Sequence, residues 1–136
     1  MSLTDSPDKR KTMYFPKFDW PRVTNPKITF PIEENLEHII ELEKKAISEI
    51  KDAIAANPDN IASMIIEPIQ GEGGDNHFRC EFMQSLREIA DENDIILIYD
   101  EVQTGVGVTG KMWAHQHFSN VDCTSSECKC GDGLLA

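Results

Sequence analysis

The stretch from Ile65 to Gly107, IIEPIQGEGGDNHFRCEFMQSLREIADENDIILIYDEVQTGVG, constrains the fold most strongly. Two short apolar runs, Ile61–Ile66 and Ile95–Tyr99, are each followed by acidic residues, and an amphipathic segment separates them. Apolar runs of this length with little alternation are typical of strands covered on both faces. A helix between two such strands favours parallel pairing, because parallel strands need a crossover connection. The stretch therefore predicts a strand, helix and strand unit of an α/β protein.

Two segments have the apolar spacing of one helix face. The first is Glu33–Ala56, with apolar residues at Leu36, Ile39, Ile40, Ala46, Ile47, Ile50 and Ile54. We interpret its polar side chains, Glu43 among them, as solvated surface. The second lies between the strands, carries Phe82, Met83, Leu86, Ile89 and Ala90 on one side, and is closed by residues 91–94. The expected fold class is α/β, as a partial three-layer sandwich with parallel strands.

The chain divides into three parts. Residues 1–31 contain prolines at 16, 21, 26 and 31, which deny the segment a long helix, so we expect an extended N-terminal arm. Its aromatic residues should pin it, most simply against a neighbouring domain or subunit. They are Tyr14, Phe15, Phe18, Trp20 and Phe30. Residues 32–118 form the α/β core fragment, and residues 119–136 form a cysteine-containing tail.

The tail holds Cys123, Cys128 and Cys130. Two cysteines one residue apart with one more nearby are a weak zinc pattern, because a second pair or histidines at ligand spacing are missing. We therefore expect no metal site. A disulfide framework is also disfavoured, since the rest of the sequence is typical of a cytosolic core.

The formal net charge of −11 disfavours nucleic acid and anionic lipid as partners, because both attract clustered Lys and Arg. No apolar run approaches the roughly 18 to 20 residues that a membrane span needs. The N-terminus, MSLTDSPDKRKTM, has no apolar signal core. We expect a cytoplasmic protein that binds neither nucleic acid nor membrane.

Glu67 and Asp100 directly follow the two expected strands. Neighbouring parallel strands end at the same edge of a sheet, where small molecules bind in open α/β folds, so the two carboxylates should lie close together. Such a pair has three chemical uses. It can divide acid and base roles in hydrolysis, bind Mg²⁺, or balance a positive charge on a bound cofactor. Spacing alone does not choose among them.

The segment after the second strand is interpreted more simply. Thr104–Gly110 is a glycine-spaced loop without the Lys-Ser/Thr of a P-loop, so we interpret it as a turn that lets backbone approach a ligand or partner closely. Lys111–Phe118 is a plausible helical turn with Trp113 on its apolar side. His115 and His117 stand two positions apart and would face different sides, which indicates surface or interface histidines.

Three motifs distinguish among the three chemical uses of the Glu67 and Asp100 carboxylates. EPIQGEGGDNHF, LIYDEVQTGVGVTGKMWAHQHF and the earlier FPKFDWPR together resemble the class-III, fold-type I, pyridoxal-phosphate-dependent aminotransferases, within them the branch of lysine 6-aminotransferases and 4-aminobutyrate aminotransferases. The resemblance runs from about Ser2 to Phe118. EPIQGEGG and DEVQTG at this separation are far more specific than any lone glycine pattern.

The resemblance implies a role for each of five residues. Asp100 would pair with the pyridinium nitrogen of the cofactor and favour its protonated form. Val102 would pack on a face of the ring, and Gln103 would donate to the phenolic oxygen of the ring. Glu67 would support Asp100 from behind. Glu72 resembles the glutamate that adjusts the family's substrate site to each of its two substrates.

The resemblance implies a reaction that moves a terminal (omega) amino group, with lysine as the expected donor, to 2-oxoglutarate, in a homo-oligomer. The family's phosphate-binding residues and substrate arginine have no counterpart in this sequence. Lys129 stands 29 positions after Asp100, near the register of the lysine that attaches the cofactor, but SSECKCGDGLLA does not match its surroundings, and the likeness is lost from Ser119. We therefore expect the chain alone to be inactive and to bind pyridoxal phosphate weakly or not at all. The alternative function is a non-catalytic module that oligomerises through uncovered sheet edges.

Overall fold

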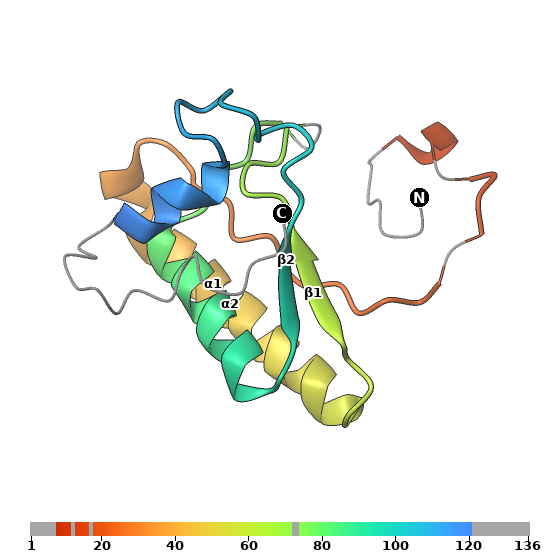
Figure 1. The fold of residues 1–136 in the computed structure, drawn as a ribbon. Coiled ribbons are helices and arrows are strands. Elements are labelled where there is room, and N and C mark those ends of the chain that lie inside the picture. The colour runs from red at the N-terminus through yellow and green to blue at the C-terminus, as the bar shows by residue number, and fades with distance from the viewer. Residues whose placement is uncertain (1–7, 12, 17, 72–73, 121–136) are drawn as a thin grey trace.

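The computed structural model describes residues 8–11, 13–16, 18–71 and 74–120 (Figure 1). Its regular elements, in chain order, are the short 3₁₀ helix η1 (Lys9–Lys11), α1 (Ile32–Ala56), β1 (Ser63–Ile66), α2 (Cys80–Glu92), β2 (Ile96–Tyr99) and the 3₁₀ helix η2 (Ala114–Asn120). Both long helices and both strands lie within a residue or two of the ranges that the apolar spacing predicts.

The two strands form a parallel pair, as the sequence predicts (Figure 1). Ser63 is opposite Ile96 and Ile66 is opposite Tyr99, so the register is continuous over four residues of each strand. α2 is the connection between the strands. The α/β class with parallel strands is confirmed.

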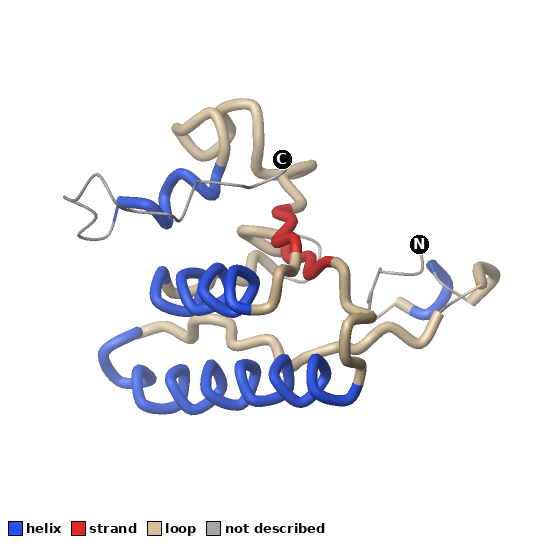
Figure 2. The backbone as a smooth tube through the Cα atoms, turned by 60° about the horizontal axis from the view of Figure 1, so that its bottom comes forward, coloured by secondary structure: helices blue, strands red, loops and turns tan. Residues whose placement is uncertain are grey.

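The elements are layered in the order sheet, α2, α1, with α2 in the middle (Figure 2). α2 packs on β2 and on η2, and α1 packs on α2. The hydrophobic core between these layers consists of Ala46, Ile50, Phe78, Phe82, Met83, Leu86, Ile89, Ala90, Ile95, Leu97 and Tyr99. The apolar positions that the sequence assigns to α2 are therefore all core residues.

One face of the two-stranded sheet is open, and the prediction that both strands are covered on both faces is wrong for the described residues. Side chains alternate along β2: Leu97 and Tyr99 are buried at 0% and 3% exposure, whereas Ile96 is 47% exposed. Ile65 on β1 is 44% exposed. Both helices lie on the same side of the sheet (Figure 2), and neither of them covers the opposite face, on which Ile65 and Ile96 are partly exposed. The apolar runs are therefore typical of strands whose second face is also covered, by a segment that the described chain does not provide.

α1 is amphipathic, but its buried face includes a charged residue. The buried residues are Ile39, Glu43, Ala46 and Ile50. Glu43 is therefore not solvated surface, as its sequence context suggests. Its Oε1 lies 3.0 Å from Nε of Arg79, which precedes α2, and Nη2 of Arg79 lies 3.3 Å from Oε1 of Glu81. This ion pair joins the start of α2 to the middle of α1.

The end of α1 is closed by Asn57. Its side-chain amide donates to the carbonyl of Ala53 at 2.9 Å, and its backbone N–H donates to Ile54. Asn93 ends α2 in the same way by donating to Ile89 at 2.8 Å. Such bonds satisfy carbonyl groups that a helix end leaves without partners. No helix in the described ranges has both the length and the apolar character to cross a membrane.

The N-terminal arm is extended, and polar contacts and a buried proline hold it against the core. Thr24 donates its backbone N–H and hydroxyl to the carboxylate of Glu49, and Ile28 donates to the carbonyl of His77 at 2.8 Å. Pro26 is fully buried. The five aromatic residues are exposed, between 47% for Trp20 and 83% for Tyr14. Exposed aromatic side chains agree with the expectation that a neighbouring domain or subunit covers them, and that expectation stays a prediction.

Candidate active site

The two acidic strand ends meet at one edge of the sheet, as the sequence predicts. Ile66 and Tyr99 are the last paired residues, so Glu67 and Asp100 leave neighbouring strands at the same level. The backbone N–H of Asp100 donates to the carbonyl of Ile66 at 2.9 Å, which extends the ladder by one bond. Both acidic residues are half-buried. This carboxyl edge of a parallel sheet is where open α/β folds bind ligands.

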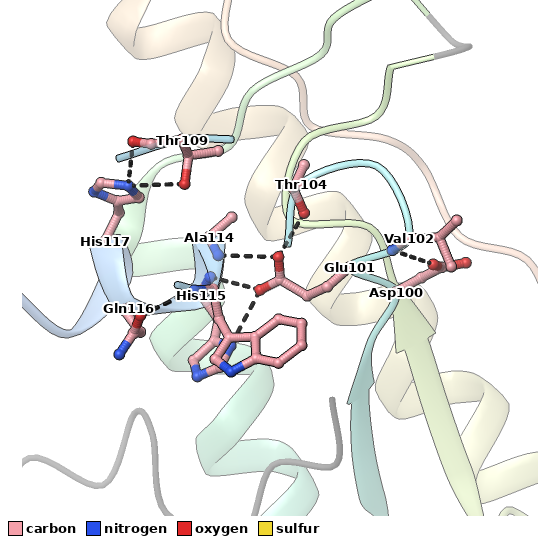
Figure 3. Close-up of polar contacts among 10 residues, drawn as sticks. Asp100, Glu101, Val102, Thr104, Thr109, Ala114, His115, Gln116 and His117 are labelled. Carbon is pink, nitrogen blue, oxygen red and sulfur yellow. Dashed lines mark hydrogen bonds and ion pairs between the residues drawn. The ribbon is translucent and has the colours of Figure 1, made fainter. Parts of the chain in front are cut away.

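Asp100 begins a tight turn whose next residues face outward. Its Oδ1 accepts the backbone N–H of Val102 at 3.1 Å (Figure 3). Val102 is 92% exposed and Gln103 is also exposed. A turn that shows a carboxylate, an apolar side chain and an amide together offers a ligand both polar and apolar contacts.

Glu101 is the most heavily bonded residue of this region, and the sequence interpretation missed it. Its side chain is only 2% exposed. Oε2 accepts the hydroxyl of Thr104 at 2.6 Å and the N–H of Ala114 at 2.9 Å. Oε1 accepts the backbone N–H of His115 at 2.8 Å and lies 3.1 Å from its Nδ1 (Figure 3). The carboxylate therefore ties the turn to η2.

The pKa of Glu101 follows from these contacts. Burial is the largest single effect and raises the pKa, because it disfavours the charged form. The hydrogen bonds from Thr104, from the backbone of His115 and Ala114, and from the His115 ring oppose burial, and together they lower the pKa below its ordinary value of 4.5. Glu101 is thus an ionised, buried anchor.

His115 is largely buried within this chain and is not the surface residue that its spacing from His117 suggests. Its side chain is 14% exposed, and its ring stacks on that of Tyr99 at a centroid distance of 5.7 Å. His117 is exposed, with Nε2 3.1 Å from the carbonyl oxygen of Thr109. The helical turn begins at Ala114 instead of Lys111.

A second loop lies against the first. A β-carbon built on Gly71 would stand 1.8 Å from Oε1 of Gln103, so the EPIQGEGG loop contacts the side chain of Gln103 closely. Gln70 and Asn76 exchange two backbone hydrogen bonds of 3.0 and 3.1 Å, which close this loop. Glu72 itself lies outside the described residues.

In the glycine-spaced loop Thr104–Gly110, the side chain of Trp113 lies close to Gly105. A β-carbon on Gly105 would stand 2.6 Å from the ring of Trp113 and 2.9 Å from the carbonyl oxygen of Glu101. The requirement for glycine at this position therefore comes from internal packing. Val106 and Gly107 have φ of 59° and 88°, the left-handed region.

Metal ligands do not gather in the described part of the chain. Within it, no group of three or more His, Cys, Asp or Glu side chains is placed to hold a metal ion. The tail cysteines at 123, 128 and 130, and Lys129, lie outside the described residues.

Known proteins are similar to this chain in both sequence and fold. Residues 1–125 match the aminotransferase class-III family. The L-lysine-epsilon aminotransferase of Streptomyces clavuligerus is 46% identical over 116 residues, 85% of this chain and 25% of that protein. A 4-aminobutyrate aminotransferase of Emericella nidulans is 45% identical over 104 residues, 76% of this chain and 21% of that protein. The structure of lysine aminotransferase from M. tuberculosis matches with a TM-score of 0.80 and 46% identity, over 86% of this chain and 26% of that one.

The fold is an α/β unit of the kind found in pyridoxal-phosphate-dependent aminotransferases. This chain belongs to the class-III aminotransferase family. Membership in that family implies dependence on pyridoxal phosphate. The chain spans about a quarter of the length of the relatives that it matches.

Proposed function

We propose that this chain forms the pyridinium-facing wall of the cofactor site of an omega-aminotransferase. One observation carries the proposal: at the carboxyl edge of the sheet, a single turn presents the carboxylate of Asp100 beside the 92% exposed Val102 and the exposed amide of Gln103. These three groups fit the three features of pyridoxal phosphate that a protein must contact at this side, namely a basic ring nitrogen, an apolar ring face and a phenolic oxygen.

Each residue then has a definite task. Asp100 holds the proton on the ring nitrogen, because a negative charge beside that atom favours its protonated form. Val102 packs on the ring face, and Gln103 donates a side-chain N–H to the phenolic oxygen. Glu67, at the end of the neighbouring strand, supports Asp100 from behind. When bound, pyridoxal phosphate supplies a ring that accepts electrons as the substrate loses a carbon-bound proton.

The proposed amino donor is lysine, through its terminal amine, and the proposed acceptor is 2-oxoglutarate. The donor is supported by the names of three relatives at 44% to 49% identity, which are L-lysine-epsilon aminotransferases; two 4-aminobutyrate aminotransferases match at 44% and 45% identity over a shorter part of this chain. Glu72 is proposed to contact the substrate, because the EPIQGEGG motif resembles the family segment that carries the substrate-site glutamate. We propose that activity also needs the parts of the relatives that this chain does not span, so that the chain alone gives no turnover and holds the cofactor weakly.

A chimera tests the function directly. Residues 1–118 of this chain replace the matching segment of the M. tuberculosis lysine aminotransferase, and glutamate formation from L-lysine and 2-oxoglutarate is measured with added pyridoxal phosphate. We expect an active chimera whose kcat falls at least about 100-fold on Asp100→Asn, since the loss of one charged partner in the site costs several kcal/mol. The exposed Glu88→Gln is the matched control. If Asp100→Asn leaves the kcat of a folded chimera unchanged, the assignment of Asp100 is refuted.

The open sheet face supports a second proposal, that this chain self-associates, either as part of a homo-oligomeric enzyme or as a non-catalytic module. Ile65 and Ile96 are 44% and 47% exposed, and apolar surface of this kind invites a partner. Sedimentation velocity over a range of concentrations distinguishes the cases. Association that Ile65→Thr and Ile96→Thr abolish supports pairing through this face, and a monomer at all concentrations argues against it.

A further inference from the structure

We propose that Glu101 is a positioning residue, which fixes the direction in which Asp100 and Gln103 face the cofactor. The inference rests on the proposed function, because it concerns the same site. Glu101 does not point toward that site itself. Its side chain and that of Asp100 point to opposite sides of the turn, Asp100 outward and Glu101 toward η2 (Figure 3).

The bonds of Glu101 connect both ends of the segment that carries the site. Thr104, at the end of the turn, donates to Oε2 at 2.6 Å, and Ala114 of η2 donates to the same oxygen at 2.9 Å. His115 donates its backbone N–H to Oε1 at 2.8 Å. In addition, the carbonyl of Glu101 accepts the N–H of Gly105 at 2.8 Å. The turn is thus fixed from within and also against a helix that lies more than ten residues further along the chain.

This arrangement needs a carboxylate and not only a polar side chain. Both oxygens of Glu101 accept a backbone N–H, from Ala114 and from His115, and a backbone N–H cannot reverse its role. A glutamine offers one oxygen and one NH₂ group. In either orientation its NH₂ group would face a buried N–H, which leaves donors without acceptors. Glu101→Gln is therefore a sharp test although it preserves shape.

The structural effect of losing the Glu101 carboxylate should be local. The hydrophobic core cluster includes Tyr99 at the end of β2 but neither Thr104 nor His115. The pairing of β2 with β1 and the packing of β2 on α2 do not involve the Glu101 side chain. Loss of the carboxylate should therefore loosen the turn and η2 and leave the sheet intact.

The test uses the ¹⁵N-labelled chain and pyridoxine 5′-phosphate, which has the ring and phosphate of the cofactor without the reactive aldehyde. For Glu101→Gln we expect amide exchange at Ala114 and His115 to rise at least about tenfold, with Leu97 unchanged, and the Gln103 side-chain NH₂ resonances to shift or broaden. The affinity for the probe, read from the shifts of the Asp100 and Gln103 amides, should fall about fivefold or more. Glu88→Gln should change none of these.

The outcomes separate the two claims. If Asp100→Asn weakens probe binding and Glu101→Gln does not, the positioning role is wrong and the cofactor site stands. If the chain alone binds the probe too weakly to measure, the affinities are measured on the chimera with the M. tuberculosis enzyme. If the probe does not bind the chimera either, or if Asp100→Asn leaves its affinity unchanged, the proposed function fails, and the Gln103 NH₂ resonances alone decide on Glu101: unchanged resonances refute its role. If Glu101→Gln does not fold, Thr104→Val, which removes a single donor, is measured in the same way, and unchanged Gln103 resonances again refute it.

Discussion

Gly71 lies so close to the side-chain amide of Gln103 that a β-carbon at position 71 would stand 1.8 Å from Oε1 and 3.0 Å from Cδ. The two residues belong to the loops that follow β1 and β2, so their contact is where the two strand ends become one surface. This contact explains why glycine follows EPIQ: a residue without a β-carbon leaves room for the Gln103 amide of the neighbouring loop.

The first prediction concerns Gly71→Ala. The atoms that would clash belong to the far end of a flexible side chain, so Gln103 should move aside and the stability should fall by only about 1 kcal/mol. The cost should appear in the site, as displaced Gln103 NH₂ resonances and weaker binding of pyridoxine 5′-phosphate. In the background of Gln103→Ala, Gly71→Ala should have no further effect on binding. An additive loss would show that Gly71 acts by another route.

A second prediction uses the pKa of Glu101. Because the folded state lowers this pKa, the ionised carboxylate stabilises the fold above the ordinary value of 4.5, and this contribution is lost as the pH falls from there through the folded-state value. The native chain should therefore lose more stability than Glu101→Gln between pH 7 and pH 3 in urea unfolding. A constant difference between the two proteins over this range would contradict the assignment.

A third prediction concerns the ion pair of α1 and α2. Burial, the largest effect, raises the pKa of Glu43, Arg79 opposes the rise, and Glu81 adds to it. A raised carboxyl pKa means that the folded state favours the protonated form, so the contribution of Glu43 to stability is highest below the ordinary value and declines as pH rises through the folded value. At pH 7, Glu43→Gln should cost little, whereas Arg79→Met should cost about 3–5 kcal/mol by leaving a buried charge alone. Chemical denaturation of both variants measures this order, and the reverse order would refute it.

A fourth prediction compares neighbours on opposite faces of β2. Leu97→Ala should cost about 2–5 kcal/mol, because Leu97 is fully buried against the helices. Ile96→Ala should cost less than about 1 kcal/mol in this chain, since Ile96 is 47% exposed. In the chimera with the M. tuberculosis enzyme, the cost of Ile96→Ala should rise if the open face is covered there. Equal costs for Ile96→Ala in the two contexts would show that the face stays open.

Local patterns were sufficient to predict the elements and the acidic edge. The helix between the strands, the parallel pairing and the strand-end positions of Glu67 and Asp100 all follow from apolar periodicity and from the need for a crossover. The open sheet face did not follow. Ile65 and Ile96 carry the pattern of covered strands because an apolar pattern records the neighbours that a sequence needs, and not whether the same chain provides them.

Contacts between residues far apart in the sequence also could not be predicted. Glu43 was assigned to the surface because its partner Arg79 is far along the chain, and His115 because its partner Glu101 was not recognised. An acidic residue directly after Asp100, followed three positions later by a threonine, was the available signal for Glu101. Such a pair is common in solvated turns, so only the burial of the carboxylate distinguishes it.

We propose above that Asp100 holds a proton on the ring nitrogen of pyridoxal phosphate. The most direct test of this proposal is the ¹⁵N chemical shift of ring-labelled cofactor bound to the chimera, compared with the Asp100→Asn variant. Our account predicts a protonated ring nitrogen in the chimera and an unprotonated one in the variant. The same shift in both proteins would contradict it.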